Sequence, residues 1–125
     1  MQPRRILLVD DEPSVLEGLR RRFRSLRREW EVVTAPEGHA ALAVLETQLV
    51  DAIVTDMRMP KMSGEVLLER VRALQPHALR ILLSGQLDAE NATLTTPLAE
   101  HCLSKPCDAS EIVRIIELPR QAVTQ

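Results

Sequence analysis

Carboxylates, a hydroxyl group and an ammonium group follow four short apolar runs of this sequence. They are Asp10 and Asp11 after residues 6–9, Asp56 after residues 52–54, Ser84 after residues 79–83 and Lys105 after residues 102–104. Short apolar runs bounded by polar residues are typical of strands buried on both faces of a parallel sheet. The carboxyl ends of such strands meet at one edge, where open α/β sheets bind their ligands. We therefore expect the five side chains to form one site.

The chemistry of this set is governed by its carboxylates. Three carboxylates held close together repel one another and raise one another's pKa unless a cation lies between them. Lys105 supplies one positive charge, and a divalent ion such as Mg²⁺, which binds carboxylates and a substrate phosphate, would supply more. A carboxylate beside such an ion is a known nucleophile that forms an aspartyl-phosphate. No Gly-rich lysine loop of the Walker type is present, so a nucleotide is not the expected phosphoryl donor.

Each of these residues also has a purely structural interpretation. Asp10, Asp11 or Ser84 alone could cap a helix or close a turn, and Lys105 alone could be a surface charge. Their joint occurrence at the ends of successive predicted strands is improbable for residues placed independently. The pattern as a whole favours a functional site centred on Asp56.

The elements that position this site follow from the periodicity of the chain. Strands are predicted at 6–9, 30–34, 52–54, 79–83 and 102–104, the second at a sheet edge because Glu31 interrupts its apolar character. Helices are predicted at 13–26, 36–49, 65–74 and 88–98, and from a cap at Asp108 or Ser110 through 116. Their apolar stripes include Leu49, Val66 and Leu74. Alternating strands and helices indicate a doubly wound α/β fold with five strands and five helices.

The composition is that of an ordinary globular domain. With 125 residues, 45% hydrophobic residues and a net charge of -2, the chain predicts one domain over 1–125, with 119–125 as a tail or linker. No apolar stretch could span a bilayer and no signal peptide is expected, so the expected location is cytoplasmic. Cys102 and Cys107 are expected to be reduced. The arginines at 20, 21, 22, 24, 27 and 28 could form a nucleic-acid patch, although such a run is more often a solvated helix face.

Four motifs resemble the receiver domain of two-component response regulators, over essentially the whole chain. They are Ile-Leu-Leu-Val-Asp-Asp-Glu-Pro at 6–13, Asp-Met-Arg-Met-Pro-Lys-Met-Ser-Gly at 56–64, Leu-Leu-Ser-Gly at 82–85 and Leu-Ser-Lys-Pro at 103–106. The resemblance implies a CheY-like sheet of order 2-1-3-4-5, an order that general knowledge of this fold supplies. Within the family, the sequence is most similar to receivers coupled to HDOD or HD-GYP output domains.

The resemblance also implies a role for each site residue. Asp56 would accept a phosphoryl group from a phosphohistidine of a sensor histidine kinase. Asp11, Asp56 and the backbone carbonyl of Arg58 would bind Mg²⁺, with Asp10 acting mainly through water. Ser84 and Lys105 would contact the phosphoryl group, and the Lys105–Pro106 peptide bond would be cis.

The family resemblance further implies a signalling domain rather than an enzyme with a separate substrate. Such a domain assists its own phosphoryl transfer and dephosphorylation. The implied partners are the kinase and an output domain or downstream protein, with a phosphorylation-linked homodimer as a further option. No direct nucleic-acid or membrane contact is implied.

One position departs from the family pattern. Three residues before the lysine, receivers usually carry a Tyr or Phe whose rotamer reports phosphorylation, whereas this chain has Cys102. Because a thiol is too small for such a movement, we expect phosphorylation to move mainly the segment 85–98, with Cys102 as a passive packing residue.

Three other functions fit parts of the sequence. A pseudo-receiver that binds partners without phosphorylation is supported only by the missing aromatic. A metal-dependent phosphatase with an aspartyl nucleophile would need a second aspartate where this chain has Arg58. A flavodoxin-like cofactor carrier would need a phosphate-binding loop after the first strand, where this chain has Asp-Asp-Glu-Pro.

Overall fold

The structure is a computed structural model, and it describes residues 4–85 and 98–118. The strands are β1 (Arg5–Val9), β2 (Glu31–Ala35), β3 (Ala52–Asp56), β4 (Leu79–Ser84) and β5 (His101–Ser104). The helices are α1 (Pro13–Leu26), α2 (Gly38–Thr47), α3 (Gly64–Leu74) and α5 (Ala109–Ile116). The helix expected at 88–98, and with it most of the segment 85–98, lies outside the described residues.

All five strands belong to one parallel sheet of order β2-β1-β3-β4-β5. The predicted doubly wound α/β fold and its strand order are confirmed, and β2 lies at an edge as expected. β3 occupies the centre, and all five of its residues are buried. The carboxyl end of β3 is therefore bordered by the carboxyl ends of β1 and β4.

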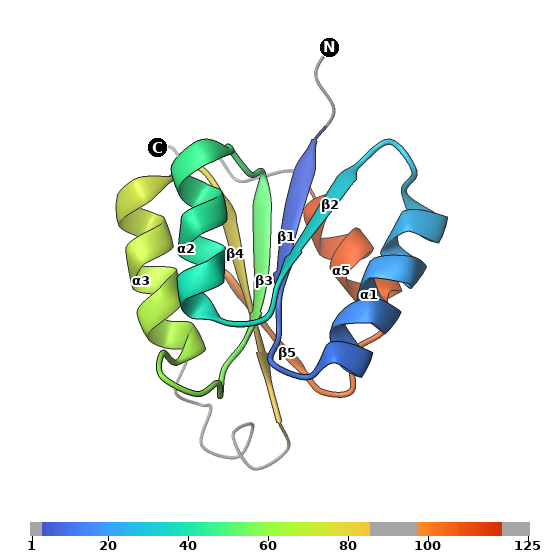
Figure 1. Ribbon diagram of the computed structural model, residues 1–125. Helices are drawn as coiled ribbons and strands as arrows, with labels where there is room; N and C mark the ends of the chain where they lie inside the picture. The colour runs from blue at the N-terminus through green and yellow to red at the C-terminus, as the bar shows by residue number, and fades with distance from the viewer. Residues whose placement is uncertain (1–3, 86–97, 119–125) are drawn as a thin grey trace.

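Helices cover both faces of the sheet, α1 and α5 on one and α2 and α3 on the other (Figure 1). The alternation of side chains along each strand divides the core accordingly. In β1, Ile6 and Leu8 pack with residues of α1 and α5, whereas Leu7 and Val9 pack with residues of α2 and α3. This double burial explains why the central strands β1 and β3 are largely apolar runs.

The second helix is shorter than the 36–49 that its periodicity predicts. Its first turn is capped by the Glu37 carboxylate, which accepts hydrogen bonds from the backbone N–H groups of His39 and Ala40. It ends at Thr47, and Leu49 is 79% exposed in the connection to β3. The placement of Leu49 on a buried stripe was therefore wrong, because the helix ends before reaching it.

The buried stripe of α3 also differs from the predicted one. Ser63 caps this helix by accepting a hydrogen bond from the N–H of Val66. The buried residues are Gly64, Leu67, Leu68 and Val71, and Val66 and Leu74 are exposed. Apolar residues occur on more than one side of α3, so periodicity alone assigned two solvent-facing residues to the core.

Candidate functional site

The site is centred on Asp56, the last residue of β3. Central position and apolar neighbours on both faces leave Asp56 only 7% exposed. The strand does not continue, because the backbone turns into the loop of residues 57–63, which leads to α3. A single carboxylate is thus held at the carboxyl edge of the sheet by the most buried strand of the fold.

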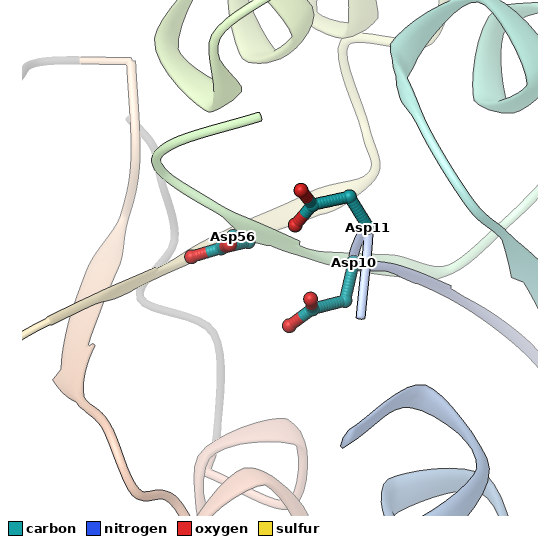
Figure 2. A group of neighbouring side chains, drawn as sticks. All are labelled: Asp10, Asp11 and Asp56. Carbon is teal, nitrogen blue, oxygen red and sulfur yellow. The ribbon is translucent and has the colours of Figure 1, made fainter. Parts of the chain in front are cut away.

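Asp10 and Asp11 reach the same edge from the adjacent strand β1. Asp10 is 1% exposed, and its Oδ1 accepts a hydrogen bond of 2.9 Å from the backbone N–H of Glu12. Asp11 is exposed. Figure 2 shows the carboxyl groups of Asp10, Asp11 and Asp56 projecting to the same side, and one oxygen of each lies within 4.8 Å of the others.

Lys105 brings a positive charge into this cluster from the end of β5. Its Nζ lies 3.3 Å from Asp10 Oδ2, 3.3 Å from Asp56 Oδ1 and 3.8 Å from Glu12 Oε1. Its backbone N–H donates to the carbonyl oxygen of Ser84 at 2.8 Å, which continues the pairing of β5 with β4 past the strand end. The Lys105–Pro106 peptide bond is cis, as expected. The ammonium therefore bridges the strands β1 and β3.

The electrostatics of the cluster follow from burial and close charges. Burial raises the pKa of the Asp56 carboxyl; Lys105 lowers it, Asp10 and Asp11 raise it, and the net shift is upward. Burial by itself lowers the pKa of Lys105, but the Asp56 and Asp10 carboxylates outweigh it and the net pKa is raised. Burial thus keeps the Asp56 carboxylate unfavourable despite the neighbouring ammonium group. Three carboxylates also outnumber the single positive charge of Lys105, so the set favours a further cation.

The remaining candidate residues lie around this centre. Ser84 ends β4 next to β3 and is 5% exposed. Arg58 lies two residues beyond Asp56, in the loop between β3 and α3. Glu12, which was not among the predicted site residues, is the third carboxylate near Lys105, after Asp10 and Asp56. Its position directly after Asp10 and Asp11 was the available signal.

A groove of about 540 Å³ opens beside Lys105, between α1 and the connection from β5 to α5. Its lining includes Gly18 and Leu19 of α1 and, on the opposite side, Cys107. Burial raises the pKa of the Cys107 thiol to about 11, and Glu111 and Asp108 contribute to the same upward shift. The thiol is therefore protonated at neutral pH, and Cys107 does not compete with Asp56 as a nucleophile.

A comparison with protein families identifies the family of this chain. The model of the response regulator receiver domain matches residues 6–117. The chain belongs to this family. The resemblance inferred from the four motifs is thus confirmed, and the receiver domains of bacterial two-component systems are its relatives.

Individual relatives agree with this assignment. The chain is 36% identical over 114 residues to the hydrogenase transcriptional regulatory protein HoxA of Bradyrhizobium diazoefficiens, covering 90% of this chain and 23% of that regulator. It thus spans about a quarter of the length of that relative. The crystal structure of a response regulator receiver domain protein from Clostridium thermocellum superposes with a TM-score of 0.76 at 33% identity, covering 90% of both chains.

A further structural relative bears on the metal. The response regulator TrrA from Thermotoga maritima, solved in complex with Mg²⁺ and BeF, is 29% identical and superposes with a TM-score of 0.75, covering 90% of this chain and 96% of that one. In the receiver domain described here, the acidic cluster consists of oxygen donors, the ligands that Mg²⁺ prefers. In the described ranges, no helix has the length and apolar character needed to cross a membrane.

Proposed function

We propose that this receiver domain is phosphorylated on Asp56 by a phosphohistidine of a sensor histidine kinase, in a Mg²⁺-dependent reaction. The change in conformation that follows would control a partner protein or an output domain. The observation that carries the proposal is the position of Lys105 Nζ, 3.3 Å from both Asp10 and Asp56, within a cluster of three carboxylates. This geometry supports one nucleophile and several charge-stabilising groups, rather than one structural ion pair.

The bond changes are those of an in-line phosphoryl transfer. An oxygen of the Asp56 carboxylate attacks phosphorus while the bond from phosphorus to the histidine nitrogen breaks. The electron pair of that bond stays on the imidazole, and the product is an aspartyl-phosphate. Lys105 is close enough to Asp56 to follow the negative charge from the carboxylate to the phosphoryl oxygens. Ser84, at the end of the neighbouring strand, is proposed to donate its hydroxyl hydrogen to the phosphoryl group.

The residues of the site fit a divalent ion. Asp11 and Asp56 are proposed to bind Mg²⁺ directly, together with the Arg58 carbonyl, and Asp10 is proposed to act through water. Asp11 suits direct binding because it is the exposed member of the cluster, whereas Asp10 is already engaged by Lys105 and by the N–H of Glu12. When bound, the ion would supply positive charge against the attacking and transferring oxygens.

Phosphorylation with a small donor tests the nucleophile directly. Purified protein is incubated with Mg²⁺ and phosphoramidate, which carries the same phosphorus–nitrogen bond as phosphohistidine, and its intact mass is measured. We expect the wild type to gain one phosphoryl group and Asp56→Asn to gain none, since an amide is not a nucleophile of comparable strength. Beryllofluoride binding gives a second readout that needs no covalent step.

Asp51→Asn is the matched control, because it removes a carboxylate at the opposite end of the same strand. Asp51 Oδ2 accepts a hydrogen bond from the backbone N–H of Arg5 and lies outside the acidic cluster. This variant should be labelled like the wild type. Equal labelling of Asp56→Asn and the wild type would refute the assignment of Asp56, and absence of labelling in the wild type would refute phosphorylation itself.

A further inference from the structure

Two buried glycines contact the loop of residues 57–63 that carries Arg58. Gly38 begins α2, and Gly64 begins α3. Neither has a positive φ angle, so the backbone conformation does not require glycine at either position. What favours glycine is space, because a Cβ atom would overlap the Asp56 backbone at position 64 and the Met62 side chain at position 38.

Gly64 closes the loop onto the backbone of Asp56 itself. A Cβ at this position would lie 2.2 Å from the Asp56 carbonyl oxygen and 3.0 Å from the Met57 Cα. The N–H of Gly64 donates to the carbonyl of Met57 at 2.8 Å, and the hydroxyl of Thr55 donates to the carbonyl of Asp56 at 3.0 Å. The end of the loop therefore cannot shift without displacing Asp56.

Gly38, in helix α2, contacts the later part of the loop. A Cβ there would lie 2.5 Å from the Met62 Sδ and 3.1 Å from the Met62 Cβ and Cγ. Met62 is 5% exposed, so it is seated on the first residue of α2 rather than in solvent. The backbone before Met62 is tightly turned, with its N–H bonded to the Pro60 carbonyl at 2.7 Å and a φ of 72° at Lys61. The Met62 thioether can rotate aside, but the Met62 Cβ is fixed to this turn, so making room for a Cβ at Gly38 would shift the backbone of residues 60–62.

We infer that Gly38 is a positioning residue for the metal site of Asp56, because it admits Met62 and Met62 holds the Arg58 segment in place. The inference rests on the proposed Mg²⁺-dependent phosphorylation. Mg²⁺ demands near-ideal octahedral geometry. A small displacement of the loop should thus affect metal binding more than it affects folding. Since Gly38 is 18 positions before Asp56 and its closest contacts are with Met62, its effect can be separated from the carboxylates themselves.

Gly38→Ala tests the contact from the side of α2. We expect the Mg²⁺ dissociation constant, measured by calorimetry on the metal-free protein, to rise about tenfold, since misplacements of about 1 Å can cost a hundredfold in an active site. The concentration of Mg²⁺ that half-saturates labelling by phosphoramidate should rise in parallel. Gly18→Ala is the control, since a Cβ at that helix position meets no atom within 4 Å, and it should leave both values unchanged.

Met62→Ala and the double variant complete the test. Met62→Ala removes the side chain that anchors the loop and should also weaken Mg²⁺ binding, so it serves if Gly38→Ala does not fold. In Gly38→Ala with Met62→Ala, the new methyl group enters the space of the missing Met62 Sδ and Cγ and rests against the retained Cβ, so Mg²⁺ affinity should exceed that of either single variant. Such recovery would show that the two residues act through one contact.

The outcomes separate this inference from the proposed function. If the wild type is labelled on Asp56 but both single variants bind Mg²⁺ like the wild type, the positioning role of Gly38 is wrong and the function stands. A lower melting temperature with unchanged Mg²⁺ affinity would also refute the positioning role, since Gly38 would then act on folding alone. If the wild type neither binds Mg²⁺ nor becomes labelled, the proposed function fails first.

Discussion

Lys105 is the residue on which the charge balance of the site depends. Its Nζ contacts the carboxylates of Asp10 and Asp56 at 3.3 Å each, while Asp11 has no such contact with it among the described residues. A compact ammonium group can approach two carboxylates from different strands at once, whereas a guanidinium group is larger, planar and suited to paired hydrogen bonds. The shape of the cationic side chain at position 105, and not only its charge, should therefore affect phosphoryl transfer.

Lys105→Arg should preserve the fold and impair phosphoryl transfer. We expect the rate of labelling by phosphoramidate to fall by about ten- to a hundredfold, because the larger head group cannot occupy the same position between the two carboxylates. The rate is measured by intact mass at fixed Mg²⁺. Lys61→Arg is the matched control, since Lys61 is the other lysine of the chain and is exposed in the loop. Labelling of Lys105→Arg at the wild-type rate would contradict this account.

At the scale of elements, the connections between helices and strands hold the site as much as the strands do. Gln75, which follows α3, is 8% exposed and ties three backbone groups together. Its Oε1 accepts from the N–H of Val50 at 2.9 Å, and its Nε2 donates to the carbonyls of Leu45 and Gln48 at 3.0 and 2.8 Å. One side chain thus fixes the end of α2 against the end of α3 and the entry to β3.

Gln75→Ala should destabilise the domain without changing its chemistry. Removing the amide leaves one backbone N–H and two carbonyls without their partner, and such losses cost roughly 1–3 kcal/mol in unfolding free energy. Urea unfolding measures this difference. Gln48→Ala is the comparison, because Gln48 meets the Gln75 amide through its backbone carbonyl, which the substitution keeps, and it should cost less. A variant Gln75→Ala as stable as the wild type would show that water replaces the three bonds.

The elements also show how far sequence reasoning reaches. The five strands were predictable because each reads as a short, largely apolar run, and the polar residues after four of these runs marked the site. The end of α2 was not predictable, because the helix stops before Leu49 although the apolar pattern of the sequence continues. The contact of Gly38 with Met62 joins residues of separate elements, and neither local sequence predicts it. Contacts that depend on how loops fold back onto helices require the three-dimensional arrangement.

At the scale of the molecule, a parallel sheet gathers its functional groups at one edge and concentrates negative charge there. Burial raises the pKa of Asp56 and Lys105 only partly offsets the shift, so the ionised Asp56 carboxylate lowers the stability of the metal-free domain at pH values above its ordinary pKa. The same close carboxylates that make the metal-free form less stable should therefore increase its affinity for a divalent cation.

Asp11→Ala should change both the stability of the metal-free protein and its stabilisation by Mg²⁺. Without metal, removing one carboxylate relieves repulsion, so the melting temperature should equal or exceed that of the wild type. With Mg²⁺ at about a hundred times its dissociation constant, the wild type should gain about 2.7 kcal/mol and the variant much less. Thermal unfolding with and without Mg²⁺ measures this difference, with Glu46→Ala, an exposed carboxylate on α2, as the control. An undiminished response of Asp11→Ala to Mg²⁺ would rule out Asp11 as a ligand.

The packing of the single tryptophan determines which structural changes intrinsic fluorescence can detect in this protein. Trp30 is the only tryptophan and the chain has no tyrosine. It is 7% exposed, contacts Phe23 of α1 edge-on with ring centroids 5.9 Å apart, and directly precedes β2 at the amino end of the sheet. The acidic cluster lies at the opposite, carboxyl end. We therefore expect the tryptophan fluorescence to report the packing of α1 on the sheet, and occupancy of the distant acidic cluster to leave the emission of the folded protein unchanged.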